Sequence, residues 1–149
     1  MNKAAFFDRD GTININTGHT YKIEELKFIS GRPELIKGYN DAGYLVIVVT
    51  NQAGIAKGLY TEDDMHRFNR HMNERLQGEY GAHIDAFYFC PHHPDVTGEC
   101  NCRKPKPGML RRAIEDFDID VGASILFGDQ AWDMQAAQAC GIKNVLLDD

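Results

Sequence analysis

Short apolar runs alternate with helix-forming segments along the whole chain. The apolar runs, each four to six residues long, are Ala4–Phe7, Tyr44–Val49, Ile84–Phe89, Ser124–Phe127 and Asn144–Leu147. Runs of this length that are mostly apolar are typical of strands buried on both faces of a sheet. Strands that alternate with helices pair in parallel through right-handed crossovers. The sequence therefore predicts an α/β fold with a central parallel sheet, which binds its ligands beyond the carboxyl ends of the strands.

Helix boundary signals support the same alternation. The predicted helices span about Pro33–Asp41, Glu62–Glu79, Pro107–Phe117 and Trp132–Cys140. Thr61 is placed as the N-cap of the second helix, with Asp64 in the capping-box position. Gly43 and Gly141 follow the ends of the first and fourth helices, where glycine is favoured.

The composition limits the class of protein. The length of 149 residues predicts a single domain over residues 1–149. The composition, with 43% hydrophobic and 26% charged residues, is that of an ordinary globular protein. A formal net charge of −6 argues against a nucleic-acid partner, because proteins that track phosphates carry a basic face. The N-terminal residues lack the basic region and long apolar stretch of a signal peptide, so we expect none, and no apolar run approaches the ~20 residues of a membrane helix. We expect a cytoplasmic, soluble monomer that does not bind membranes.

The motif Asp8-Arg9-Asp10-Gly11-Thr12 directly follows the first predicted strand. Two carboxylates and a substrate phosphate within ~4 Å repel one another by roughly 4 kcal/mol per pair, so the cluster calls for a divalent cation such as Mg²⁺. With the ion in place, Asp8 is suited to attack phosphorus and Asp10 to donate and later accept a proton. The alternative is an ordinary Ca²⁺-type or turn loop, which the same motif also fits.

Other polar residues follow the later strands. Thr50 and Asn51 end the second strand and are suited to hold the oxygens of a phosphoryl group, while Lys104 can offset the charge of a phosphorylated intermediate. Asp129 follows the fourth strand and would complete the metal site. Asp133 lies four residues later, on the same helical face if the helix has begun by then. Each residue alone is also an ordinary turn or surface residue, but their shared place at strand ends favours one phosphoryl-transfer site.

Taken together and in this order, Asp8-Arg9-Asp10-Gly11-Thr12, Thr50-Asn51, Lys104 and Gly128-Asp129 resemble the four motifs of the haloacid dehalogenase (HAD) superfamily of phosphatases. The resemblance covers essentially the whole chain and implies a Rossmann-like three-layer α/β/α fold, an aspartyl-phosphate intermediate and Mg²⁺. It implies Asp8 as nucleophile and metal ligand, and Asp10 as acid/base and, through its carbonyl oxygen, metal ligand. It also implies that Thr50 and Lys104 stabilise the phosphoryl group and that Asp129 binds the metal.

Three of the four cysteines lie with a histidine in one short stretch, as Cys90-x-His92 and Cys100-x-Cys102. His93 is the alternative to His92, and the families that this loop resembles use the first histidine of the pair. Three thiolates and one imidazole are enough for a closed tetrahedral Zn²⁺ site, which is structural because it leaves no position open for water. Such a site would make rigid the zinc-binding loop that leads into Arg103. Disulfides are not expected in an intracellular chain of this length, and chance clustering of the four residues is the alternative.

The zinc loop, residues 50–58 and residues 102–109 closely resemble the D-glycero-D-manno-heptose 1,7-bisphosphate 7-phosphatase family. The resemblance implies a sugar phosphate substrate that loses its 7-phosphate during nucleotide-activated heptose and lipopolysaccharide biosynthesis. The implied substrate site consists of Asn16, Thr17, Gly18, His19, Thr50, Asn51, Gln52, Ala53, Arg103, Lys104 and Gln130. Gln130 is a departure, because the heptose enzymes carry lysine there. The histidinol-phosphatase family, which shares the zinc loop, is the alternative.

A chain of this length has no room for a large cap domain over the site. Selectivity must then come from three short loops, residues 13–22, 53–60 and 91–102. Tyr21 and Lys57 are further candidate contacts in these loops.

Two other function classes fit part of the pattern. A phospho-aspartate signalling switch also uses an acidic cluster, a Thr and a Lys-Pro, but its Lys-Pro follows the last strands, whereas Lys104-Pro105 precedes the strand that ends near Asp129. A zinc-knuckle nucleic-acid binder fits the Cys/His loop, but the acidic balance and the lack of interleaved aromatic and basic residues oppose it. A Mg²⁺-dependent phosphomonoester hydrolase accounts for all the motifs.

Overall fold

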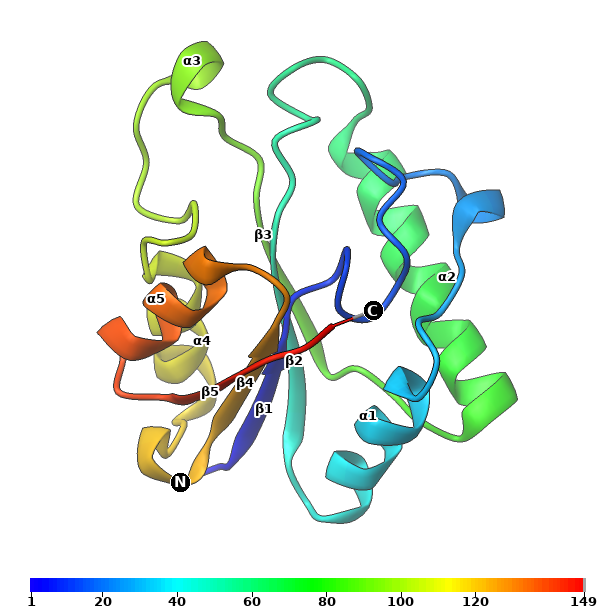
Figure 1. Ribbon diagram of the computed structural model, residues 1–149, viewed down its shortest axis with the longest axis vertical. Helices are drawn as coiled ribbons and strands as arrows, with labels where there is room; N and C mark the ends of the chain where they lie inside the picture. The colour runs from blue at the N-terminus through cyan, green and yellow to red at the C-terminus, as the bar shows by residue number, and fades with distance from the viewer. Residues whose placement is uncertain (149) are drawn as a thin grey trace.

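The computed structural model describes residues 1–148 and contains one parallel sheet of five strands. The strands are β1 (Ala4–Phe7), β2 (Leu45–Asn51), β3 (Ala86–Cys90), β4 (Ile125–Gly128) and β5 (Lys143–Leu146), in the order β3-β2-β1-β4-β5 (Figure 1). Each lies within two residues of its predicted bounds. The parallel sheet confirms the predicted α/β class.

Helices cover both faces of the sheet. Figure 1 shows α1 (Arg32–Asp41) and α2 (Glu62–Tyr80) on one side, and α4 (Gly108–Phe117) and α5 (Ala131–Ala139) on the other. Each side has its own buried apolar cluster: Phe7 and Val48 pack with α1 and α2, whereas Phe6 and Ile47 pack with α4 and α5. Alternate residues of β1 and β2 thus face opposite layers, as the two-residue period of a strand requires. The result is the expected three-layer α/β/α arrangement.

The helix ends follow the predicted signals. The Thr61 hydroxyl accepts a hydrogen bond from the Asp64 amide at 3.1 Å, and the Asp64 carboxylate accepts one from the Thr61 amide at 3.0 Å. This reciprocal pair is the predicted capping box. Gly43 and Gly141 adopt φ values of 83° and 73° just after α1 and α5, where the chain reverses toward the next strand.

Short elements that were not predicted occur in the connecting segments. They are α3 (Pro94–Thr97) and two 3₁₀ turns, η1 (Ile23–Glu25) and η2 (Val121–Ala123). In α3 the His93 ring accepts a hydrogen bond from the Asp95 amide, and Pro94 occupies the first turn. A single turn of this kind has too few residues for a periodic signal in the sequence.

The strand order places the site. The chain crosses from β1 to β2 on one side and reaches β4 on the other, so the carboxyl end of β1 lies at the point where the order reverses. The loops that follow β1 and β3 rise above this edge in Figure 1. Within residues 1–148 no separate cap domain covers the edge, and none of the helices is both long and apolar enough to span a membrane.

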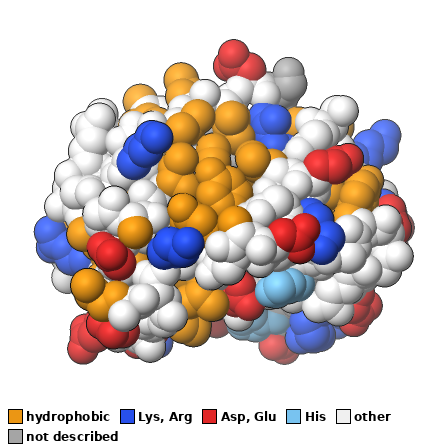
Figure 2. Space-filling view, turned by 90° about the horizontal axis from the view of Figure 1, so that it is seen from below, with side chains coloured by type: hydrophobic (Ala, Val, Ile, Leu, Met, Phe, Trp, Pro, Cys, Tyr) orange, Lys and Arg blue, Asp and Glu red, His pale blue; other side chains and the backbone are white. Residues whose placement is uncertain are grey.

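Figure 2 shows, from below, the end of the molecule that lies opposite the carboxyl edge of the sheet. Apolar side chains gather at the centre of this view, and charged side chains of both signs surround them. The polar loops and the long connections lie at the other end, above the carboxyl edge of the sheet.

Replacement of Thr61 by alanine removes the side-chain acceptor at the start of α2. The unfolding free energy should fall by about 1 kcal/mol, which urea denaturation followed by circular dichroism can measure. Thr61→Ser keeps the hydroxyl and should unfold close to the wild type. Equal urea midpoints for the alanine variant and the wild type would show that the capping box contributes nothing to stability.

Candidate active site

A cavity of about 300 Å³ lies at the carboxyl edge of the sheet. Its lining includes all but one of the residues predicted for catalysis, Mg²⁺ and substrate: Asp8, Asp10, Asn16, Gly18, His19, Thr50, Asn51, Gln52, Ala53, Arg103, Lys104, Asp129 and Gln130. The exception is Thr17, whose hydroxyl lies 2.8 Å from that of Thr20 within its own loop. Lys57, Tyr60 and Trp132 also line the cavity.

Three carboxylates converge beside the cavity, and two of them, Asp8 and Asp129, line it. Asp8 follows β1, Asp129 follows β4 and Asp133 lies in the first turn of α5, and each offers one oxygen within 4.8 Å of the others. Carboxylate oxygens are the ligands that Mg²⁺ prefers.

Gly11 makes room for the cluster, because a Cβ at its position would lie 2.2 Å from Asp129 Oδ2. Its φ of 85° also favours glycine, so the turn after the two acids needs this residue.

The buried ammonium group of Lys104 lies between two of these acids. Lys104 Nζ is 3.0 Å from Asp8 Oδ1 and 2.5 Å from Asp133 Oδ1, and it donates to the Val49 carbonyl at 2.9 Å. Burial alone would lower the pKa of Lys104, but the two carboxylates outweigh it and raise the pKa above its ordinary value. Lys104 is therefore charged and fixed beside Asp8.

Asp8 is buried, with only 7% of the residue exposed. Its burial raises its pKa from 3.8 to about 7; Lys104 opposes this effect, whereas the neighbouring carboxylates Asp133 and Asp10 add to it. More negative charge is concentrated here than one lysine can balance. A divalent cation at the cluster would remove the imbalance.

Asp133 has a role that the sequence pattern did not predict. The helix α5 starts only at Ala131, so Asp129 precedes it and the two acids do not share a helical face. Asp133 Oδ2 instead accepts hydrogen bonds from the Asp129 and Gln130 amides, both at 3.2 Å. Asp133 thus caps α5 with one oxygen and binds Lys104 with the other.

Residues at the end of β2 hold the segment that carries Lys104. The Asn51 side chain accepts a hydrogen bond from the Lys104 amide at 3.0 Å. Thr50 is buried, and its hydroxyl accepts a hydrogen bond from the Gln52 side chain at 3.0 Å. Arg103 lies between the cavity and the Cys/His loop, where its guanidinium donates to the His92 carbonyl at 3.4 Å. The end of β2 and the end of the loop are thereby fixed to each other.

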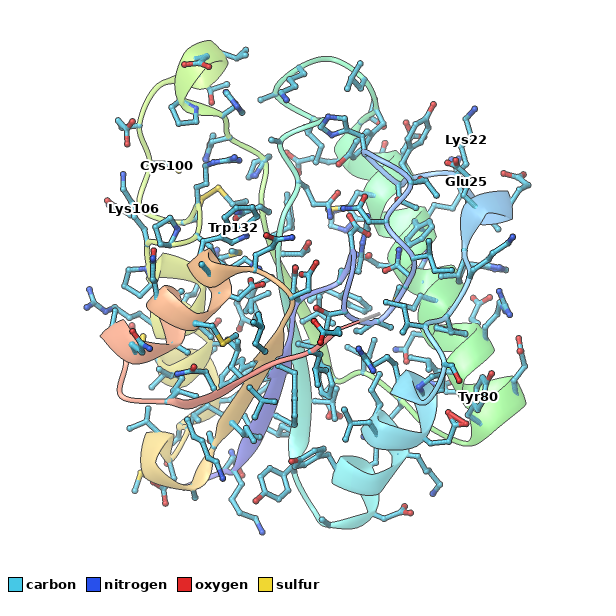
Figure 3. All side chains as sticks on the ribbon, in the orientation of Figure 1. Lys22, Glu25, Tyr80, Cys100, Lys106 and Trp132 are labelled. Atoms are coloured by element: carbon cyan, nitrogen blue, oxygen red, sulfur yellow. A yellow bond between two sulfur atoms is a disulfide. The ribbon has the colours of Figure 1, made fainter. Side chains whose placement is uncertain are left out.

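The predicted zinc ligands do come together. Cys90 Sγ lies 3.6 Å from both His92 Nδ1 and Cys100 Sγ, and Cys102 Sγ lies 3.3 Å from His92 Nδ1. A tetrahedral zinc site with thiolate bonds near 2.3 Å has edges of roughly 3.8 Å, so these separations suit the ion. Figure 3 shows Cys100 on this loop, above the start of α5 that carries Trp132.

The structure also differs from the sequence prediction at this cluster. Cys90 and Cys102 are joined as a disulfide, which was not expected. The disulfide follows from proximity, because the cluster brings the sulfur atoms of its cysteines close to one another. The donor set of three thiols and one imidazole fits zinc when this pair is reduced.

Tyr60 and Trp132 are the cavity residues that sequence reasoning missed. The Tyr60 hydroxyl bonds to the Gln52 side chain, and burial raises the pKa of Tyr60 to about 12. Trp132 is 43% exposed in the first turn of α5. A single aromatic residue in a loop or helix start gives no pattern that separates a pocket residue from a core residue, and only the fold places these two at the cavity.

Comparisons with known proteins cover nearly the whole chain. The family model described as HAD-hydrolase-like matches residues 101–149. The D-glycero-beta-D-manno-heptose-1,7-bisphosphate 7-phosphatase of Haemophilus ducreyi is 42% identical over 149 residues, which cover 97% of this chain and 82% of the relative. The corresponding alpha enzyme of Burkholderia mallei is 46% identical, with 98% of this chain and 79% of the relative covered.

A solved structure agrees. The D,D-heptose 1,7-bisphosphate phosphatase from B. bronchiseptica, in complex with magnesium and phosphate, superposes with a TM-score of 0.88 and is 33% identical. The match covers 97% of this chain and 79% of that one. Both kinds of comparison, by sequence and by structure, therefore point to the same group of enzymes.

Replacement of Asp8 by asparagine tests the electrostatics of the cluster. Because the pKa of Asp8 is raised from 3.8 to about 7 on folding, the folded chain holds a proton that the unfolded chain has lost between these pH values. The wild-type carboxylate therefore costs stability increasingly as the pH rises through this window. In Mg²⁺-free buffer, Asp8→Asn should be more stable than the wild type by on the order of 4 kcal/mol at pH 8, and by less than half as much at pH 5.

Urea denaturation at the two pH values measures this difference. Asp41→Asn is the control, because the Asp41 carboxylate is largely exposed beside Lys37. A stabilisation by Asp8→Asn that does not change with pH would contradict the raised pKa.

Proposed function

Because the chain belongs to the HAD-like heptose-bisphosphate phosphatase family, we propose that it removes the 7-phosphate of a D-glycero-D-manno-heptose 1,7-bisphosphate. One observation carries this proposal: Asp8, Lys104 and Asp129 lie together in the lining of a cavity that is large enough for a sugar phosphate. We also propose that residues 1–149 form one phosphatase domain.

Asp8 is the proposed nucleophile. One of its carboxylate oxygens forms a bond to phosphorus while the bond between phosphorus and the sugar oxygen breaks, and Asp10 gives a proton to that oxygen. A water molecule then attacks the aspartyl-phosphate, Asp10 takes its proton, and the bond between phosphorus and Asp8 breaks to release phosphate. Lys104, 3.0 Å from Asp8, offsets the negative charge of the intermediate.

Mg²⁺ is the proposed metal of this site. Asp8 and Asp129 would bind it with their carboxylates, and Asp10 with its carbonyl oxygen. When bound, the ion neutralises the negative charge that the phosphoryl oxygens add to the acids. The convergence of three carboxylates and the raised pKa of Asp8 support this assignment, as does the magnesium and phosphate in the B. bronchiseptica relative.

The substrate residues surround the phosphoryl site. Thr50 and Asn51 line the cavity from the end of β2, and Asn16, Gly18 and His19 line it from the loop after β1. Arg103 and Lys57 supply the cations at the cavity that are not paired with Asp8, and they are suited to the second phosphate of the substrate. Gln130 has no charge and instead donates to Asp129 Oδ2 at 3.3 Å.

Zinc is the proposed structural metal of the Cys90, His92, Cys100 and Cys102 cluster. The disulfide between two of these residues leaves the other two donors in contact with its sulfur atoms, an arrangement that a disulfide alone does not require. With all thiols reduced, zinc would hold the loop that leads directly into Arg103 and Lys104. A reducing, cytoplasmic location belongs to this proposal, because zinc needs thiolates.

The function is tested by phosphate release with and without Mg²⁺. Heptose 1,7-bisphosphate, as each anomer, should be hydrolysed with a kcat/KM at least about 10-fold above that of histidinol phosphate, a difference of roughly 1.4 kcal/mol. Phosphorus NMR should show the remaining phosphate at position 1, and Asp8→Asn should release no phosphate. Faster hydrolysis of histidinol phosphate would keep the phosphatase and reject the sugar substrate.

The zinc site is tested by the metal content of protein purified in reductant. The wild type should hold about one zinc per chain, and Cys100→Ser should lose most of it and unfold at a lower temperature. Cys140→Ser changes a cysteine outside the cluster and should keep the metal. A reduced wild type without zinc, after growth in zinc-supplemented medium, would reject the zinc site.

A further inference from the structure

We infer that Arg9 is a positioning residue, which fixes the carboxylate of Asp10 for proton transfer to the leaving oxygen; this inference rests on the proposed function. Arg9 is completely buried and is the largest fully buried side chain among the residues described. It lies between the two acids of the motif in sequence, and its side chain contacts Asp10 as well as Thr20 and Asn69.

Arg9 holds Asp10 at two points. Its Nε lies 2.9 Å from Asp10 Oδ1, and its Nη2 lies 3.2 Å from Asp10 Oδ2. Two parallel contacts from a planar guanidinium fix the plane of a carboxylate as well as its position. The Asn14 side chain adds a donor to Oδ1 at 3.0 Å, and the Gln52 side chain adds one to Oδ2 at 3.4 Å. Asp10 nevertheless lines the cavity, and its side chain is 17% exposed.

Arg9 itself is held by three other segments. Its Nη1 donates to Asn69 Oδ1 on α2 at 3.0 Å, and its Nη2 donates to the Thr20 carbonyl at 2.6 Å and to Gln52 Oε1 at 3.3 Å. The guanidinium carbon lies 4.5 Å from the centre of the Phe68 ring, in a cation–π contact. The position of Asp10 is thus set by α2 and by the loops after β1 and β2.

The charges at the site are divided between two buried cations. Lys104 contacts Asp8 and Asp133, whereas Arg9 contacts Asp10. Burying a guanidinium is costly, and an apolar residue of similar size would fill the same space more stably if packing were its only purpose. Arg9 therefore has a role beyond packing, and its two-point contact with the proton donor identifies that role.

The contribution of a positioned proton donor depends on the leaving group. A sugar alkoxide is a poor leaving group and needs the proton as the P–O bond breaks, whereas p-nitrophenolate leaves readily without it. Loss of Arg9 should therefore impair hydrolysis of alkyl phosphates much more than hydrolysis of p-nitrophenyl phosphate. A purely structural role would lower both rates by the same factor.

Arg9→Lys keeps the charge but cannot make the two-point contact. We expect kcat/KM for heptose 1,7-bisphosphate to fall roughly 100-fold and kcat/KM for p-nitrophenyl phosphate to fall less than about 10-fold. The unfolding temperature is recorded in parallel. Equal losses for the two substrates, or no loss, in a folded variant would overturn the inference.

Asn69→Asp decides the question if Arg9→Lys does not fold. This change is isosteric, lies on α2 outside the cavity, and gives Arg9 a carboxylate that competes with Asp10. The same selective loss is expected, to a smaller extent, and unchanged selectivity would overturn the inference. Arg70→Lys, at the adjacent exposed position of α2, is the control and should leave both rates unchanged.

This experiment is separable from the test of the substrate. If the wild type prefers another alkyl phosphate, the sugar assignment fails, and the comparison with p-nitrophenyl phosphate is made with that ester instead. Selective loss in the variants then still supports the role of Arg9.

Discussion

The contact of the Lys104 ammonium group with Asp8 and Asp133 is the interaction on which the rest of the site depends. Moving one such charge out of water costs on the order of several kcal/mol, and only partners with good geometry offset this cost. Here the partners come from the ends of β1 and β2 and from the first turn of α5, while Lys104 arrives from the loop after β3. Movement of any one of these segments would take a partner away from the buried ammonium group, so the fold and the site stabilise each other.

The Cys/His loop delivers Lys104 to this contact. Cys102 lies two residues before Lys104, and the Asn51 side chain holds the main chain of Lys104 against the end of β2. Gly108 closes the loop, because a Cβ there would lie 2.1 Å from the Asn101 carbonyl oxygen and would push the start of α4 away. A cross-link within the loop, by disulfide or by metal, therefore acts on the site through the position of the lysine.

The sequence was sufficient for those features that depend on local patterns. Strand and helix positions followed from apolar periodicity and cap residues, and Asp8, Thr50 and Asp129 could be brought together because parallel strands end at one edge. Features set by side-chain direction could not be predicted in this way. The contact of Asp133 with Lys104, the direction of Thr17 and the place of Trp132 each depend on where a turn points a side chain, and no residue spacing specifies that.

Asp8 and Asp10 also show that residue spacing does not specify the direction of a side chain. Asp8 and Asp10 are separated by one residue, yet Asp8 faces Lys104 and the acidic cluster while Asp10 faces Arg9 and the loop after β1. Because each acid has its own buried cation, a divalent ion that binds near Asp8 and Asp129 need not disturb the partners of Asp10. The turn at Gly11, with Arg9 directed into the core, thus gives two identical side chains different environments and makes different roles in one reaction possible.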